Sequence, residues 1–189
     1  LFAGVEEFLL YDFFTAQGGV NEDVYAYSNG LGSERALVVY HNRYGDTSGW
    51  IRTSVGYSVK GSDGSRTIVQ RSLGEGLNLH SNPQTYCIFR DQMTGMERIL
   101  PSQELIEKGM YLALGAYECH VFLDFREVSD DQWGSYRRLY EYLGQRGVPN
   151  IQFRPRGAKD SRVARALMDA AQGYRVLIPN DRLIDPSVE

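Results

Sequence analysis

The sequence predicts a mainly β protein, an antiparallel β-sandwich with a C-terminal α-helical extension, which makes it α+β overall. The sandwich is indicated by short extended runs between Val24 and Val128, and by the Gly, Asn and Asp residues that separate these runs. The extension is indicated by a change of period after Val128, where apolar residues begin to recur at spacings of three and four. A chain of 189 residues can bury a sizeable core without a metal ion or a disulfide.

The same patterns divide the chain into three parts. Residues 1–20 are expected to be a connector from a missing upstream domain, because the chain opens without an initiator Met on an apolar run that reaches Phe14. Residues 21–128 are expected to form the sandwich, and residues 129–189 are expected to form the helical extension.

The first strands are expected at residues 24–27 and 35–41, because turn residues at 29–32 separate them. Residues 50–60 alternate between apolar and polar side chains, which predicts one strand with a core face and a solvent face. The set expected to face the core is Ile51, Thr53, Val55, Tyr57 and Val59.

Two hairpins follow from local turn chemistry. The turn Ser62-Asp63-Gly64-Ser65, whose glycine can adopt positive φ, predicts a hairpin that brings back residues 67–71 as the partner strand. A second hairpin is expected between residues 85–91 and 96–100, which flank a tight turn at Met93-Thr94-Gly95.

The last elements of the sandwich are a short helix and two strands. Ser102 is expected to cap a single helical turn from Glu104 to Lys108, which Gly109 ends. Residues 110–116 and 118–125 are expected to be the final strands.

Beyond the sandwich, a helix is expected from Asp131 to Gln145, with Ser129 as its cap and acidic residues in its first turn. Its apolar stripe, which requires a packing surface, is Trp133, Tyr136, Leu139, Tyr140 and Leu143. Trp133 is expected to pack the helix onto the sheet. A second helix is expected at residues 161–172. The tail also fits a β-α-β-α-β arrangement with a small parallel sheet, in which residues 151–153 would be the middle strand.

Composition and charge exclude several classes of partner and cofactor. Twenty basic and 24 acidic residues give a net charge of -4, without the excess of cations that binding to a nucleic acid requires. No run of apolar residues is long enough to cross a membrane, so no membrane partner is expected. Cys87 and Cys119 lack metal-ligand spacing and are expected to be free thiols, which favours a cytoplasmic location. No cofactor is expected, because no glycine-rich loop matches a phosphate-binding or dinucleotide-binding motif. No metal site is expected, because the cysteines lack ligand spacing and the three histidines are far apart in sequence.

A metal-binding or an acid/base role is geometrically possible for Glu118 and His120, because residues two apart on a strand share a face. A structural pair, in which the carboxylate holds the imidazole, is the favoured interpretation. Cys119 and His120 cannot act as a dyad, because adjacent residues of a strand point to opposite faces.

Four carboxylates near aromatic residues, expected in loops, lie where a glycosidase acid and nucleophile could be placed. They are Asp12, Glu22, Asp23 and Asp46. None of them belongs to a recognisable motif, so they are interpreted as solvated or capping groups, and no catalytic residue is predicted.

Tyr44 and Trp50 are the candidate carbohydrate-binding residues. They flank the loop Gly45-Asp46-Thr47-Ser48-Gly49, and an exposed aromatic ring beside polar groups suits the apolar face and the hydroxyls of a sugar. The alternative is that Trp50 begins a core strand while Tyr44 covers the loop.

Three segments resemble the C-terminal β domain of α-amylase-type glycoside hydrolases. Residues 20–29 and 35–42 resemble the segment in which the chain of that family leaves the catalytic barrel, and residues 110–122 resemble the domain's last strands. The resemblance implies that the catalytic Asp, Glu and Asp belong to a (β/α)8 barrel that is absent from this chain. No catalytic residue is therefore carried over.

The resulting hypothesis is a non-catalytic C-terminal accessory domain of an α-amylase-like glycosidase or transglycosylase. Its partners would be the upstream catalytic barrel of the same polypeptide, which it supports, and α-glucan. One alternative is a stand-alone carbohydrate-binding β-sandwich that uses Tyr44 and Trp50. Another is a small hydrolase that uses Glu118 and His120.

Overall fold

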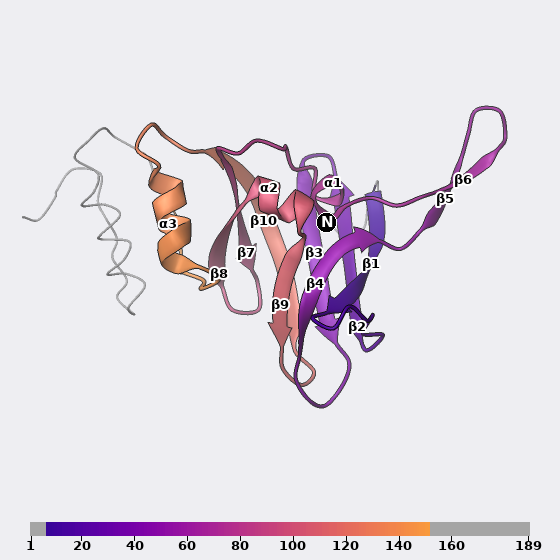
Figure 1. Ribbon diagram of the computed structural model, residues 1–189, viewed down its shortest axis with the longest axis horizontal. Helices are drawn as coiled ribbons and strands as arrows, with labels where there is room; N and C mark the ends of the chain where they lie inside the picture. Colours follow the sequence, from indigo (N-terminus) through magenta and orange to yellow (C-terminus); the bar gives the residue numbers. More distant parts are fainter. Residues whose placement is uncertain (1–6, 152–189) are drawn as a thin grey trace, which may run out of the picture. The chain divides into compact units, whose positions relative to one another are not determined.

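A computed structural model describes residues 7–151, which lie in one compact unit, and the statements below concern these residues (Figure 1). The strands are β1 (Glu7–Thr15), β2 (Val24–Leu31), β3 (Glu34–His41), β4 (Thr47–Ser54), β5 (Tyr57–Lys60), β6 (Arg66–Val69), β7 (Thr85–Asp91), β8 (Met96–Pro101), β9 (Met110–Leu114) and β10 (Cys119–Ser129). The helices are α1 (Leu73–Gly76), α2 (Ser102–Glu107) and α3 (Ser135–Leu143).

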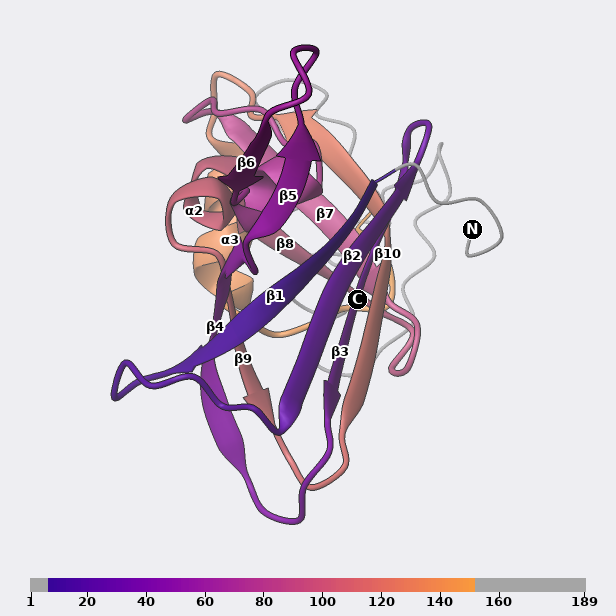
Figure 2. The ribbon, with the colours of Figure 1, turned by 90° about the vertical axis from the view of Figure 1, so that its right-hand side faces the viewer.

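Eight of the described strands form one sheet in the order β8-β7-β10-β3-β2-β1-β4-β9, and every neighbouring pair is antiparallel. The sheet is curled, so that β9 and β8, its two edge strands, approach each other (Figure 2). The predicted mainly β, antiparallel class is confirmed. The alternative β-α-β-α-β arrangement of the tail would make the strand at residues 121–125 part of a parallel sheet. Instead, this strand belongs to β10, which pairs antiparallel with β3 and β7. The later strands of that arrangement lie outside the described residues.

The N-terminal segment is not the connector that the sequence predicts. Glu7–Thr15 forms β1, which is hydrogen-bonded between β2 and β4 in the interior of the sheet. Its alternate residues Leu9, Tyr11 and Phe13 are buried in the core. The prediction was wrong because an apolar run shows that a segment is buried, but not which strands it pairs with.

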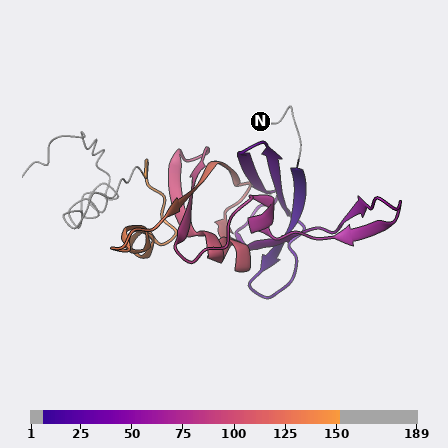
Figure 3. The same ribbon diagram turned by 90° about the horizontal axis from the view of Figure 1, so that it is seen from above.

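The strand expected at residues 50–60 is two strands. β4 ends at Ser54, and β5 pairs only with β6 in a two-stranded hairpin that extends away from the sheet (Figures 1 and 3). Gly64 has a φ of 82°, as its turn requires. Apolar and polar side chains continue to alternate along this hairpin, but the hairpin does not pack on the core. Ile68 is therefore 77% exposed.

The other predicted hairpins are present. β2 and β3 pair as far as Leu31 and Glu34, so the turn is Gly32-Ser33 and the strands are longer than expected. β7 and β8 form the second hairpin, in which Gly95 has a φ of 71°.

The core lies on the concave side of the sheet. Its largest fully buried side chains include Phe13, Phe89 and Phe122, and the rings of Phe89 and Phe122 meet edge to face at 5.4 Å. Burying each such side chain contributes about 1.5–3 kcal/mol, so this packing dominates the stability of the sheet.

α2 connects the two edge strands, because it follows β8 and precedes β9. Its N-cap is Pro101, which makes no side-chain hydrogen bond, and Ser102 is the first helical residue, not the cap. Gly109 ends this segment with a φ of 77°, and a Cβ atom there would collide with the carbonyl oxygen of Ile51.

α3 begins later than predicted and is capped by other residues. Ser129 is the last residue of β10, whereas the carboxylates of Asp130 and Asp131 accept hydrogen bonds from the backbone N–H groups of Tyr136 and Ser135. The helix buries Tyr136, Leu139 and Leu143, and the ring of Tyr136 stacks on that of Tyr86 in β7 at 6.4 Å. Trp133, expected to pack the helix onto the sheet, is 45% exposed. The second predicted helix lies outside the described residues.

Glu97 joins three parts of the structure in one buried cluster. Its carboxylate accepts hydrogen bonds from Arg90 of β7 and Arg126 of β10, both at 2.8 Å, and from the backbone N–H of Ile151 at 2.6 Å. Burial opposes ionisation, but the hydrogen bonds from Arg126 and Ile151 and the charges of both arginines hold the pKa of Glu97 below its ordinary value.

We expect Glu97→Gln to lower the free energy of unfolding at pH 7 by about 2 kcal/mol, because both arginines lose a charged partner but stay partly hydrated. A carboxylate with a lowered pKa makes its full contribution to the free energy of unfolding when the pH is above its ordinary pKa of 4.5. This contribution is lost as the pH falls through the pKa of the folded state. The difference between wild type and variant in urea unfolding should therefore shrink below about pH 4.5. Glu34→Gln, at an exposed site, is the control; equal effects of the two substitutions would contradict this account.

Candidate functional site

Tyr44 and Trp50 do not form the shared platform that the sequence suggests. Tyr44 lies in the loop between β3 and β4 and is 82% exposed. Trp50 lies within β4, half-buried on the side opposite the core residue Ile51. The edge of Tyr111 meets the Trp50 ring at 4.9 Å, and the guanidinium of Arg52 lies 4.9 Å from the ring's centre. Its ring is therefore already engaged, whereas that of Tyr44 is free for a ligand.

The loop after Tyr44 lines an open depression of about 510 Å³. It is lined by Thr15, Ala16, Gln17, Asp46, Thr47, Ser48, Ala113, Leu114 and Gly115. The Asn21 amide donates to the Thr47 hydroxyl at 2.9 Å, and this bond fixes the start of β4. A depression of this size with a mostly polar lining can accept a small polar ligand.

The loop between β9 and β10 stands beside the β3–β4 loop, at the lower end of the view in Figure 1. The backbone N–H of Tyr117 donates to the carbonyl of Arg43 at 3.2 Å, and the backbone N–H of His41 donates to the carbonyl of Glu118 at 2.9 Å. The Glu118 carboxylate in turn accepts from the N–H of Gly115 at 2.6 Å. These bonds hold the two loops together.

Tyr117, in the β9–β10 loop, is a candidate binding residue that the sequence pattern does not predict. It is 57% exposed and has a φ of 55°, a backbone conformation that bulky residues rarely adopt. The sequence does not indicate the positive φ of Tyr117, because Gly or Asn is the usual residue at such a position.

Glu118 and His120 are in contact, but as part of a packed cluster. His120 Nε2 lies 3.2 Å from Glu118 Oε1, and Nδ1 lies 2.8 Å from Oδ2 of the fully buried Asp91. His120 is itself buried, and none of the three residues lines either of the two cavities described in this section. Both ring nitrogens are engaged, so the favoured structural interpretation fits and a hydrolase built on this pair does not.

The other predicted carboxylates do not assemble into a pair. Asp12 lies in β1 and not in a loop, and Glu22 is exposed. Asp23 forms an ion pair of 2.8 Å with Arg43, while Asp46 lines the open depression. Within residues 7–151 no three His, Cys, Asp or Glu side chains gather in a way that could hold a metal ion.

The two thiols are unpaired, as expected. Burial raises the pKa of Cys87, and burial together with the charge of Asp91 raises the pKa of Cys119. A raised thiol pKa leaves little thiolate at neutral pH, so neither residue has the character of a nucleophile.

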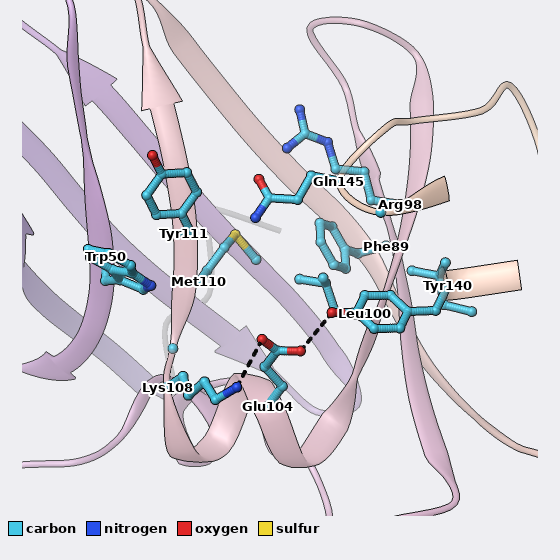
Figure 4. Close-up of a pocket in the computed structure, with 13 residues that line it drawn as sticks. Trp50, Phe89, Arg98, Leu100, Glu104, Lys108, Met110, Tyr111, Tyr140 and Gln145 are labelled. Carbon is cyan, nitrogen blue, oxygen red and sulfur yellow. Dashed lines mark hydrogen bonds and ion pairs between the residues drawn. The ribbon is translucent and has the colours of Figure 1, made fainter. Parts of the chain in front are cut away.

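A second cavity, of about 50 Å³, lies between the edge strands β8 and β9 (Figure 4). Glu104 of α2 accepts a hydrogen bond of 2.8 Å from the Tyr140 hydroxyl and pairs with Lys108 at 3.5 Å. Burial, together with the hydrogen bond to Glu104 and the charge of that carboxylate, raises the pKa of Tyr140 to about 12. The space can hold a few water molecules but not a sugar ring. We therefore interpret this cavity as a packing gap between β8 and β9, and not as a binding site.

Comparison of the chain with family models, with curated proteins and with solved structures finds no match. Among the described residues, no helix has the length and apolar character needed to cross a membrane.

We expect His120→Ala to cost about 3 kcal/mol in unfolding free energy, because Asp91 would be left buried without its partner. Cys119→Ser, on the neighbouring residue that faces the other side, should cost less than about 1 kcal/mol. Chemical denaturation of both variants measures the difference. A stable His120→Ala variant would show that the cluster is not structural.

Proposed function

We propose that this chain is a non-catalytic C-terminal accessory domain of an α-amylase-like glycosidase, which supports a catalytic barrel and contacts α-glucan. The observation that carries the proposal is the apolar side of the sheet that faces away from the core. We call this side the outer face; it comprises Phe8, Leu10, Tyr25, Tyr27, Val38, Tyr40 and Val121.

The outer face is continuous across four strands. The register places Leu10 of β1, Tyr27 of β2, Val38 of β3 and Val121 of β10 in one row. In the next rows the ring of Phe8 lies 5.4 Å from that of Tyr27, and Tyr25 pairs with Tyr40. An antiparallel sheet with one face in water normally carries polar side chains there.

Within residues 7–151 nothing is packed over the centre of this face, since Phe8, Leu10 and Tyr25 are each about half exposed. Contiguous exposed apolar surface of this kind marks an interaction site in soluble proteins. The partner that we propose is the catalytic barrel of the same polypeptide, to which the resemblance of residues 20–29 and 35–42 points.

The concave side of the sheet supports a non-catalytic role for the domain. The concave side is filled by the core, and His120 and Asp91, which are both buried, have no access to a substrate. The two unpaired cysteines support a reducing, cytoplasmic setting. The second candidate, a stand-alone carbohydrate-binding module, is favoured only by the exposed ring of Tyr44 beside the open depression.

The proposal predicts that the purified chain does not hydrolyse starch or maltodextrin, whereas a longer polypeptide encoded by the same reading frame does. Release of reducing sugar measures both activities. Hydrolysis by the chain alone would refute the proposal, and so would a reading frame without a barrel-length segment before Leu1.

A further inference from the structure

The open depression has three polar side chains that are free to bind. Gln17, Asp46 and Ser48 make no side-chain hydrogen bond or ion pair within residues 7–151. They supply an amide, a carboxylate and a hydroxyl, and among residues 7–151 no lysine or arginine lines the depression. This combination suits a neutral ligand that is rich in hydroxyl groups, and it disfavours an anion.

Two exposed tyrosines stand next to this lining. Tyr44 is two residues before Asp46, and Tyr117 is two residues after Gly115, while both Asp46 and Gly115 line the depression. The two loops meet here, since a Cβ atom on Gly115 would lie 3.9 Å from Asp46 Oδ1. The hydrogen bond from Tyr117 to Arg43 keeps the two tyrosines on adjacent backbone segments.

The conformation of Tyr117 points to a binding role. A φ of 55° is a conformation that Gly or Asn adopts without strain, yet the position carries a large aromatic residue that is mostly exposed. Neither packing nor turn geometry explains the ring. An exposed ring held on an anchored loop can stack on the apolar face of a sugar.

We propose that the depression bordered by the β1–β2, β3–β4 and β9–β10 loops binds a neutral oligosaccharide chain, with Tyr44 and Tyr117 stacking on its rings. Gln17, Asp46 and Ser48 bind the sugar hydroxyls, and Trp50 takes no part. The identification of the sugar as an α-glucan rests on the proposed function. The presence of a saccharide site is argued from the depression and the two tyrosines alone.

Titration of the chain with maltoheptaose, cellohexaose and laminarihexaose, followed by amide chemical shifts, tests this proposal. We expect saturable shifts at residues 15–17, 43–49 and 115–118. Tyr44→Ala and Tyr117→Asn should each weaken binding about five- to tenfold. Because Asn tolerates positive φ, Tyr117→Asn should keep or raise the melting temperature, so weaker binding would not reflect unfolding.

Phe8→Ala and Trp50→Ala are the matched aromatic controls outside the depression, and both should bind as the wild type does. No binding of any of the three sugars would overturn the site, as would unaltered binding by Tyr117→Asn. Binding of a β-glucan alone would support the site and count against the α-glucan role. If the outer face did not bind a catalytic barrel, this titration would give the same result, because the outer face does not line the depression.

Discussion

The fold depends on the short connection between the two edges of its sheet. α2 has six residues and provides a rise of about 9 Å, and residues 108–109 add at most about 7 Å before β9 begins. In a flat sheet the strands β8 and β9 would be about 33 Å apart, because neighbouring strands are spaced by about 4.7–4.9 Å. The sheet must therefore curl, and Gly109 makes the last step possible where no side chain fits beside Ile51.

The curl decides where chemistry can take place. It turns Phe13, Phe89 and Phe122 toward one another and fills the concave side, so the buried pair of His120 and Asp91 has no space for a substrate. Two surfaces remain available on the outside: an apolar face on the central strands, and a polar depression bordered by three loops at one end. The first suits a protein surface, and the second suits a hydroxyl-rich ligand.

Local features were predictable from the sequence, and pairings were not. The turns at Gly64 and Gly95 marked their hairpins, because a glycine at positive φ is a property of the turn alone. The place of β1 in the sheet and the break after Ser54 could not be predicted, since both depend on partners distant in sequence. At the candidate site the loop after Tyr44 was found from sequence, but Tyr117 was not, because only the fold brings its loop alongside.

We propose that this self-supporting sheet presents its outer face to another part of the same polypeptide. Hydroxyl-radical footprinting of the isolated chain and of the full polypeptide is the sharpest test of this arrangement. We expect Phe8, Leu10 and Tyr25 to be oxidised in the isolated chain and protected in the full polypeptide, while Phe13 and Phe122 are protected in both. Equal oxidation of Leu10 in both forms, or oxidation of the core phenylalanines in the isolated chain, would contradict it.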